Sequence, residues 1–299
     1  MNIAFFGTSD RSIPLLEALK NSDFDLVLCI TKEDTVIGRE RKSKSTAVKE
    51  WSEANRVQYV TIEKLDSQST AYIKNLIFEK NIELCVVADF SILIPEELLS
   101  APKHGFVNVH FSLLPSYRGA SPVQFAILNG DKKTGISYLV VVEKLDAGPI
   151  IFQSEYELSG NETSVSLYKI LFEKAARELP DVISKYISGK LKHVEQNEKN
   201  ATYTYSPTHL KSTLIFKEDA KIDWGKTPEK IDRAIRAYNP WPISWTTLGD
   251  LNSHYCSIKP DKDFSLKVKI FEPGMKKLQV EGKTILSWEE FENGYVVKS

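Results

Sequence analysis

The sequence predicts an α/β protein: a doubly wound, Rossmann-like domain at the N-terminus, followed by a smaller β-rich domain of the OB-like barrel type. Three observations lead to this prediction. The chain has 299 residues, more than one typical domain needs. Its first half alternates short apolar runs with stretches of helical spacing. A polar, irregular stretch that begins near residue 191 separates this half from segments of β-type composition.

The apolar runs of the first half are the expected strands of a mostly parallel sheet. Asp25–Thr31 (DLVLCIT) is a continuous run, as in strands that are buried on both faces. The other expected strands are Ile3–Phe6, Glu83–Ala88, Phe106–His110, Gly135–Val142 and Pro149–Gln153. Apolar residues recur at helical spacing over Ser12–Lys20 and Ala71–Glu79, and a further helix is expected after Thr163, a residue type that caps helices.

We expect three segments: a catalytic domain over residues 1–190, a linker over 191–208 and a second domain over 209–299. Thr227-Pro228 is typical of a helix start, with Thr as the cap and Pro in the first turn. Ile231, Ile235 and Tyr238 then form one apolar stripe. The remaining sequence consists of short β-type segments broken by Gly and Pro, which predicts a small, mostly β domain.

Composition excludes several classes of protein. Lys and Arg number 39 against 40 Asp and Glu, a net charge of −1, so the chain does not coat nucleic acid through bulk charge. The three cysteines lack C-x-x-C spacing and no histidine pair has metal-ligand spacing, so we expect no metal site. The start of the sequence lacks a basic region, and no run reaches about 18 apolar residues. We therefore expect a monomeric cytoplasmic protein with no signal peptide and no membrane span.

The segment most suited to chemistry is GFVNVHFSLLPSYRGASP, at residues 105–122. Side chains alternate along a strand, so Asn108 and His110 share one face, near the carboxyl end where open α/β sheets bind ligands. A carboxamide can donate a hydrogen bond to a developing oxyanion, and an imidazole can move a proton near neutral pH. The pair therefore suits acyl-group transfer. The alternative is a polar pair that only closes the end of a strand.

The residues downstream favour the catalytic interpretation. Ser112-Leu113-Leu114-Pro115 forms a tight apolar loop, and we expect its backbone groups to be free to meet a flat heterocycle. Asp146, in the turn LDAGP, is the nearest acidic candidate to orient His110 or to accept a proton. The alternative for Asp146 is a turn residue that caps its own backbone.

The ordered pattern NVHFSLLPSYRGASP, with TGISY and LDAGP downstream, resembles the formyltransferases that use 10-formyltetrahydrofolate. The resemblance implies that Asn108, His110 and Asp146 are catalytic and that the donor is 10-formyltetrahydrofolate, with no metal ion required. It also implies two folate-contacting loops. Their residues are Ser112, Leu113, Leu114 and Pro115 in one, and Phe90, Ser91 and Ile92, within ADFSILIP, in the other.

The chain departs from the family pattern in two of its short motifs. The family usually has Tyr-Gly where this chain has Phe90-Ser91. It usually has Gly-Thr-Pro-x-Phe where this chain has Gly7-Thr8-Ser9-Asp10-Arg11.

Two further resemblances point to methionyl-tRNA as the acceptor. The loop Thr31–Lys49 resembles the basic insertion by which some family members grip an acceptor stem. The implied RNA-binding residues are Arg39, Arg41, Lys42 and Lys44. AKIDW at 220–224 and RAIRAYNPWPISW at 233–245 resemble the start of the family's tRNA-binding barrel. The implied reaction is formyl transfer to the α-amine of methionyl-tRNA, for translation initiation.

Two other functions stay open on the sequence alone. A sugar-nucleotide N-formyltransferase would share the core and the folate donor but would not need the basic loop. A non-enzymatic RNA-binding module could keep the fold, although it would have no use for Asn108, His110 and Asp146 together. Near the C-terminus, Lys267 and Lys269 share one strand face and can form part of a stripe that contacts phosphates. The alternative is that these lysines only prevent aggregation at a sheet edge.

Overall fold

The computed structural model describes residues 1–37 and 42–297. Contacts divide the chain into two compact units, which are interleaved along the sequence. Unit 1 comprises Met1–Arg118, Gly135–Tyr156 and Tyr168–Thr202. Unit 2 comprises Gly119–Thr134, Glu157–Leu167 and Tyr203–Ser299. The domain boundaries expected from the sequence stay a prediction.

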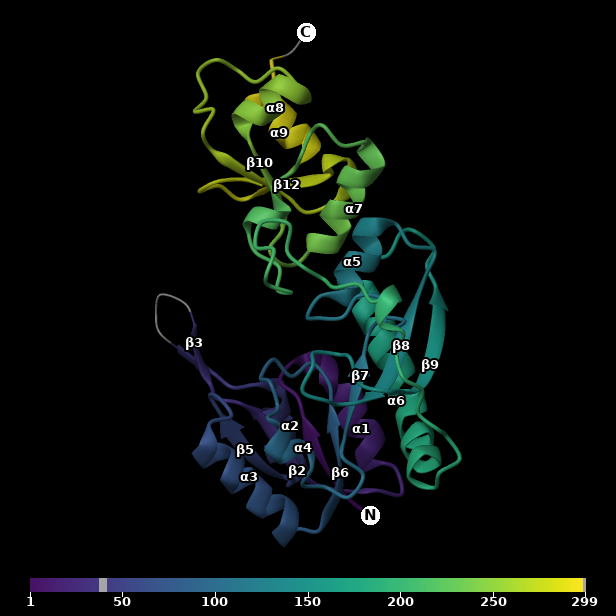
Figure 1. Ribbon diagram of the computed structural model, residues 1–299. Coiled ribbons are helices and arrows are strands. Elements are labelled where there is room, and N and C mark those ends of the chain that lie inside the picture. The colour runs from purple at the N-terminus through teal and green to yellow at the C-terminus, as the bar shows by residue number, and fades with distance from the viewer. Residues whose placement is uncertain (38–41, 298–299) are drawn as a thin grey trace. The chain divides into compact units, whose positions relative to one another are not determined.

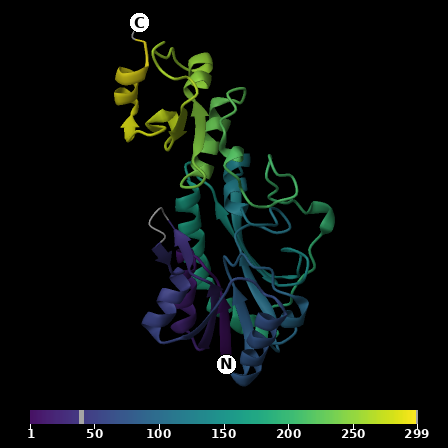
Figure 2. The ribbon, with the colours of Figure 1, turned by 90° about the vertical axis from the view of Figure 1, so that its left-hand side faces the viewer.

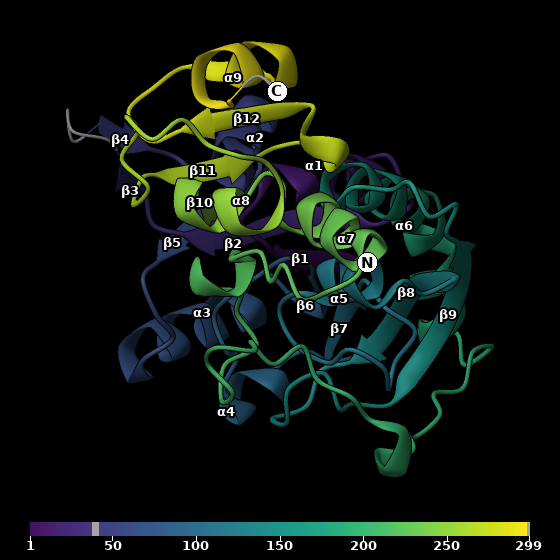
Figure 3. The same cartoon turned by 90° about the horizontal axis from the view of Figure 1, so that it is seen from above.

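Unit 1 is built on a seven-stranded sheet with the order β5-β2-β1-β6-β7-β8-β9, which can be followed across Figure 3. Its strands are β1 (Asn2–Phe6), β2 (Asp25–Lys32), β5 (Gln58–Ile62), β6 (Ile82–Val87), β7 (Phe106–His110), β8 (Lys133–Val140) and β9 (Ile150–Glu157). Strands β5, β2, β1, β6 and β7 pair in parallel, and β7 pairs with β8 antiparallel. The doubly wound α/β prediction is confirmed.

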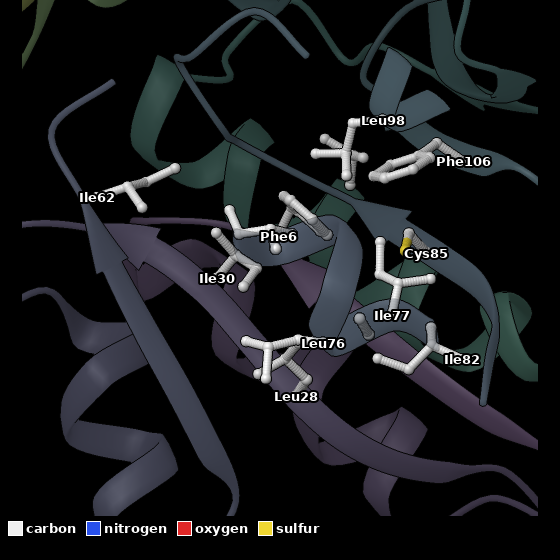
Figure 4. Close-up of a cluster of buried hydrophobic side chains, with 13 residues drawn as sticks. Phe6, Leu28, Ile30, Ile62, Leu76, Ile77, Ile82, Cys85, Leu98 and Phe106 are labelled. Carbon is white, nitrogen blue, oxygen red and sulfur yellow. The ribbon is translucent and has the colours of Figure 1, made fainter. Parts of the chain in front are cut away.

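Helices cover both faces of this sheet. They are α1 (Ile13–Lys20), α2 (Ala47–Asn55), α3 (Ser67–Glu79), α4 (Glu96–Leu99) and α6 (Ser164–Ile187). In Figure 3, α3 and α4 lie on one side of the sheet and α1, α2 and α6 on the other. The apolar runs produce this arrangement because alternate side chains of each strand point to opposite faces. On the α3 side, Phe6 and Leu28 of the sheet pack with Leu76 and Ile77 of α3 (Figure 4).

The parallel strands all point toward one edge of unit 1. Figures 1 and 2 show β1 rising from the N-terminus at the lower edge, so the carboxyl ends of these strands lie at the upper edge in both views. A short hairpin of β3 (Thr35–Ile37) and β4 (Lys42–Lys44) projects from this edge, between β2 and α2 (Figure 1).

Unit 2 contains a four-stranded antiparallel sheet with the order β10-β11-β12-β13. Its elements are α5 (Pro122–Asn129), α7 (Pro228–Tyr238), β10 (Ser244–Thr247), α8 (Leu248–His254), β11 (Lys267–Ile270), β12 (Lys277–Val280), β13 (Ile285–Ser287) and α9 (Trp288–Tyr295). Val268 and Leu278 of the sheet pack with Leu251 of α8 and Phe291 of α9. The β-rich second part is confirmed, and α8 and α9 are two helices that the sequence interpretation did not include.

The start of α7 agrees with the sequence in one respect and differs in another. Pro228 occupies the first turn, as predicted. Thr227 is the N-cap residue, also as predicted, but its side chain makes no capping hydrogen bond.

Candidate active site

Asn108 and His110 lie at the carboxyl end of β7, beside the end of β6. Val87 of β6 pairs with Asn108, and on the other side Ser137 of β8 pairs with His110. Val107 and Val109, which alternate with them, are 0% and 2% exposed. This alternation gives β7 one apolar face and one face that carries two polar side chains. Burial of those polar groups is tolerated only where they find suitable hydrogen-bond partners.

Asp146 supplies those partners. Asn108 Nδ2 donates to Asp146 Oδ1 at 3.2 Å, and His110 Nδ1 lies 3.6 Å from Asp146 Oδ2. The His110 and Asp146 side chains are only 6% and 10% exposed. The structure thus brings the three residues together, although Asp146 lies 38 positions from Asn108 in the sequence.

Both ring nitrogens of His110 face an oxygen. Nε2 lies 3.0 Å from the carbonyl oxygen of Tyr117, which can only accept a hydrogen bond. Nδ1 lies on the other side of the ring, 3.6 Å from Asp146 Oδ2. An imidazole held between a carbonyl and a carboxylate is placed to move a proton.

The turn that carries Asp146 has an unusual backbone. Asp146 has a φ of +49°, a left-handed conformation that costs an ordinary residue about 1 kcal/mol or more unless its surroundings hold it. Gly148 follows, and a Cβ there would come 1.8 Å from the carbonyl oxygen of Val140. Gln196 Nε2 donates to the carbonyls of both Asp146 and Gly148, at 2.8 and 2.7 Å. The position of the carboxylate is therefore set by a tightly specified turn.

Arg118 follows the Ser112–Pro115 loop and belongs to unit 1. Its side chain is 0% exposed, and its guanidinium donates to Gln196 Oε1 and to both oxygens of Glu198. Lys144 also binds Glu198, at 2.6 Å. The hydrogen bonds from Arg118 and Lys144 lower the pKa of Glu198 to about 2. Sequence reasoning missed Gln196 and Glu198 because they lie in a polar segment without periodicity.

The loop Ser112–Pro115 is held by side chains of β8 and β9. Leu114 donates its N–H to Ser137 Oγ at 3.0 Å, and its carbonyl accepts from Gln153 Nε2 at 2.9 Å. Ser137 Oγ in turn donates to the carbonyl of Ser112 at 2.6 Å. The expectation that this loop's backbone is free is therefore wrong for these groups. The side chains of Leu113 and Pro115 are half-buried, whereas that of Leu114 is buried.

The second predicted loop follows β6. Phe90 packs edge-on against Phe6, with ring centroids 5.5 Å apart, and Ile92 packs against the same apolar cluster. Ser91 between them is exposed. The loop is thus anchored in the core at Phe90 and Ile92 and presents Ser91 to solvent.

A charged pair occupies the place where the N-terminal pattern departs from the family. Arg11 donates to Asp89 Oδ2 from Nε at 3.0 Å and from Nη2 at 2.7 Å. Its guanidinium also lies 4.1 Å from the ring centroid of Tyr168. Ser9 donates to the same carboxylate. Arg11 and Asp89 follow the neighbouring strands β1 and β6, so the pair lies at the same sheet edge as His110.

Comparison with known proteins identifies the family. The formyl transferase model matches residues 1–183, and the model of the formyl transferase C-terminal domain matches residues 214–275. The chain belongs to the formyl transferase family. A methionyl-tRNA formyltransferase of Bacillus cereus (strain B4264) is 37% identical over 298 residues, which cover 99% of this chain and 86% of the relative. That of Bacillus cytotoxicus is 39% identical over 248 residues, which cover 83% and 76%.

Solved structures share the formyltransferase fold at lower identity. An N-formyltransferase from Helicobacter canadensis, in complex with folinic acid and dTDP-3-aminofucose, matches with a TM-score of 0.62 and 19% identity. The match covers 95% of this chain and 98% of that one. Phosphoribosylglycinamide formyltransferase from Bacillus halodurans matches with a TM-score of 0.55 and 23% identity, over 64% and 97%. At these identities the likeness shows the fold alone.

The basic loop of this formyltransferase is the β3–β4 hairpin. Arg39 and Arg41 lie outside the described residues, and Lys42 and Lys44 belong to β4. Lys44 is exposed. Lys49, after the hairpin, forms an ion pair with Asp34 at 2.8 Å, and this hydrogen bond lowers the pKa of Asp34. Lys49 and Asp34 therefore neutralise each other.

In unit 2, strand β11 carries two lysines on the outward face of the four-stranded sheet. Lys267 and Lys269 of β11 are exposed, while Val268 and Ile270 point into the core. Lys267 Nζ lies 4.7 Å from the ring centroid of Trp245 on β10. We call Lys267, Lys269 and Trp245 the sheet-face patch.

Metal-binding clusters and membrane-spanning helices are both absent from the described part of the chain. Within residues 1–37 and 42–297, no group of three or more His, Cys, Asp or Glu side chains is placed to hold a metal ion. None of the helices in the same ranges is long and apolar enough to cross a membrane.

Proposed function

We propose that this formyltransferase transfers a formyl group from 10-formyltetrahydrofolate to the α-amine of methionyl-tRNA, the acceptor used in translation initiation. The observation that carries the proposal is the cluster in which one carboxylate, Asp146, meets both the Asn108 amide and the His110 ring. Relatives named methionyl-tRNA formyltransferase, 37–39% identical, support the choice of acceptor. The proposed location is the cytoplasm, and the proposed state is a monomer.

The proposed reaction begins when the neutral α-amine attacks the formyl carbon. A carbon–nitrogen bond forms, and the formyl oxygen gains negative charge. The Asn108 amide donates a hydrogen bond to that oxygen, and protonated His110 stabilises the same charge. Asp146 keeps His110 oriented and takes the proton that the amine loses, directly or through water. The bond to the folate nitrogen then breaks, and that nitrogen leaves with a proton.

The donor is a substrate of this reaction, and two loops are proposed to bind it. One is Ser112–Pro115, which offers the side chains of Leu113 and Pro115. The other carries Phe90, Ser91 and Ile92. Both loops are anchored, the first through Ser137 and Gln153 and the second through the apolar cluster around Phe6. Anchored loops suit the positioning of a flat ring system, because little ordering is needed when it binds.

The acceptor is proposed to be held by two basic elements: the hairpin, through Arg39, Arg41, Lys42 and Lys44, and the sheet-face patch. The exposed lysines of this patch can contact phosphates, and the half-buried ring of Trp245 lies beside Lys267. We further propose residues 1–190 as the catalytic domain, 191–208 as the linker and 209–299 as the RNA-binding domain.

The proposal is tested by product analysis. The full chain is incubated with 10-formyltetrahydrofolate and methionyl-tRNA, and the amino acid released from the tRNA is analysed by mass spectrometry. We expect formylmethionine, and far less of it in the same time when His110→Ala replaces the wild-type chain. If wild-type chain yields only unmodified methionine, the proposed reaction is wrong.

A further inference from the structure

We propose that Gln196 is a positioning residue for the formyl-transfer reaction: it holds the turn of Asp146, and through that turn the Asp146–His110 pair. This inference rests on the proposed function. Gln196 lies 50 positions from Asp146 in the sequence. Its side-chain amide binds the backbone of the turn, not the side chain of Asp146. Arg118, Gln196 and Glu198 together are called the brace.

The hydrogen bonds of Gln196 use its whole carboxamide. Nε2 donates to the carbonyls of Asp146 and Gly148, at 2.8 and 2.7 Å. Oε1 accepts from Nε and Nη2 of Arg118, at 3.1 and 2.8 Å. The two carbonyls can only accept and the guanidinium can only donate, so the orientation of the amide is fixed by its partners. Because Gln196 is bound on both sides, it fixes the position of the turn relative to Arg118.

The turn needs such support. Asp146 has a φ of +49°, and the two carbonyls that Gln196 binds, those of Asp146 and Gly148, belong to this strained region. The carboxylate that meets Asn108 and His110 leaves the backbone at this point. A small rotation of the turn would move Oδ1 and Oδ2 away from both partners.

The brace also reaches the other side of His110. The carbonyl that binds His110 Nε2 belongs to Tyr117, the residue before Arg118. Arg118 itself is fully buried and is bound by both oxygens of Glu198, at 2.7 and 3.2 Å. A continuous series of contacts therefore leads from His110 through Tyr117, Arg118 and Gln196 to Asp146, which itself faces His110. Arg118 is thus joined to one partner of the imidazole through the backbone and to the other through Gln196.

Gln196→Glu separates positioning from general stabilisation. A carboxylate still accepts from Arg118, but it has no hydrogen to donate and turns an oxygen toward the carbonyls of Asp146 and Gly148. The turn should be released while Arg118 stays bound. We expect kcat to fall about 10- to 100-fold, because a displacement of about 1 Å can cost that much. The KM values for donor and acceptor should change less than about 2-fold.

The matched control is Asn197→Asp, which adds the same charge one residue away. The Asn197 side chain is exposed and accepts a hydrogen bond from Lys199 N, which Asp can also do. We expect wild-type kcat in this variant. An equal loss of kcat in Asn197→Asp and Gln196→Glu would overturn the proposal, because added charge alone would explain it. Wild-type kcat in Gln196→Glu would overturn it as well.

A second measurement does not depend on the substrate. The ¹⁵N signals of the His110 ring are recorded in the free full chain and assigned by their absence in His110→Ala. We expect them to move in Gln196→Glu and in Gln196→Met, and to stay in place in Asn197→Asp. Unmoved signals in both Gln196 variants would overturn the positioning role. If the signals move as expected but the wild type does not formylate methionyl-tRNA, the proposed function fails and the positioning role stands.

Discussion

His110 is held between a carboxylate and a carbonyl, and Asn108 shares the carboxylate. Replacing either residue by Ala removes a group that acts on the reacting atoms. We expect Asn108→Ala to lower kcat about 10²–10³-fold, through loss of an oxyanion donor. For His110→Ala we expect about 10²–10⁴-fold. Steady-state kinetics measures both, with His104→Ala as the control because His104 precedes β7 at its opposite end. If a variant has the same kcat as the control, the replaced residue takes no part in the chemistry.

Gly148 is a further residue of the site at which substitution should be harmful. Gly148→Ala places a Cβ 1.8 Å from the Val140 carbonyl, so the turn of Asp146 has to move. We expect a lower melting temperature and a loss of activity, measured by thermal unfolding and by the formylation assay. Gly294→Ala is the control, since a Cβ there meets nothing within 4 Å and the residue lies in α9. Equal melting temperatures and equal activities of the two variants would mean that the turn tolerates the displacement.

At the level of single residues, much of the candidate site could be predicted. Strand alternation in FVNVH placed Asn108 and His110 on one face, and the LDAGP turn suggested Asp146 as their partner. Gln196 could not be predicted, because its contacts are side-chain hydrogen bonds to backbone carbonyls 48 and 50 positions away. No periodicity or residue type in a polar segment reveals such contacts.

Glu198 should make the stability of unit 1 depend on pH in the acid range. Arg118 and Lys144 lower the pKa of Glu198 from its ordinary 4.5 to about 2. A lowered pKa stabilises the fold above the ordinary pKa, and this contribution is lost as pH falls toward the lowered one. Glu198→Gln should therefore melt below the wild type at pH 7, and the difference should shrink between pH 4.5 and 2. A difference in melting temperature that is constant from pH 7 to pH 2 would refute this assignment.

Among the elements, the buried parallel strands were predicted well and the short amphipathic helices poorly. Continuous apolar runs such as Asp25–Thr31 have one interpretation in an α/β chain. Helix α9 was missed because its aromatic residues, Trp288, Phe291 and Tyr295, resemble a β-type composition. The missed signal was the capping box, in which Ser287 and Glu290 exchange hydrogen bonds at the start of the helix.

For the whole molecule, a net charge of −1 means that RNA binding has to come from local basic elements. We expect neutralising Lys267 and Lys269 to weaken methionyl-tRNA binding and to flatten the dependence of log Kobs on log salt. The slope should fall by up to about 0.7–0.9 for each phosphate that the protein no longer neutralises. Neutralising Arg39, Arg41, Lys42 and Lys44 should do the same without changing folate affinity. Filter binding across a salt series measures both.

The control for these substitutions neutralises Lys190 and Lys192, two exposed lysines elsewhere in unit 1. Their replacement should leave the salt slope unchanged. If all three sets of substitutions give the same slope, neither the hairpin nor the sheet-face patch holds RNA. The sheet-face lysines would then serve only to keep the exposed strands soluble.

The central claim concerns the acceptor, and one competition measures it directly. The wild-type full chain is supplied with limiting 10-formyltetrahydrofolate that carries a labelled formyl group, together with equal concentrations of methionyl-tRNA and an amino-sugar nucleotide. The ratio of labelled products gives the ratio of kcat/KM values. We predict at least about 10²-fold preference for methionyl-tRNA. Label that accumulates mainly on the sugar nucleotide would contradict the account, even with the catalytic roles of Asn108, His110 and Asp146 intact.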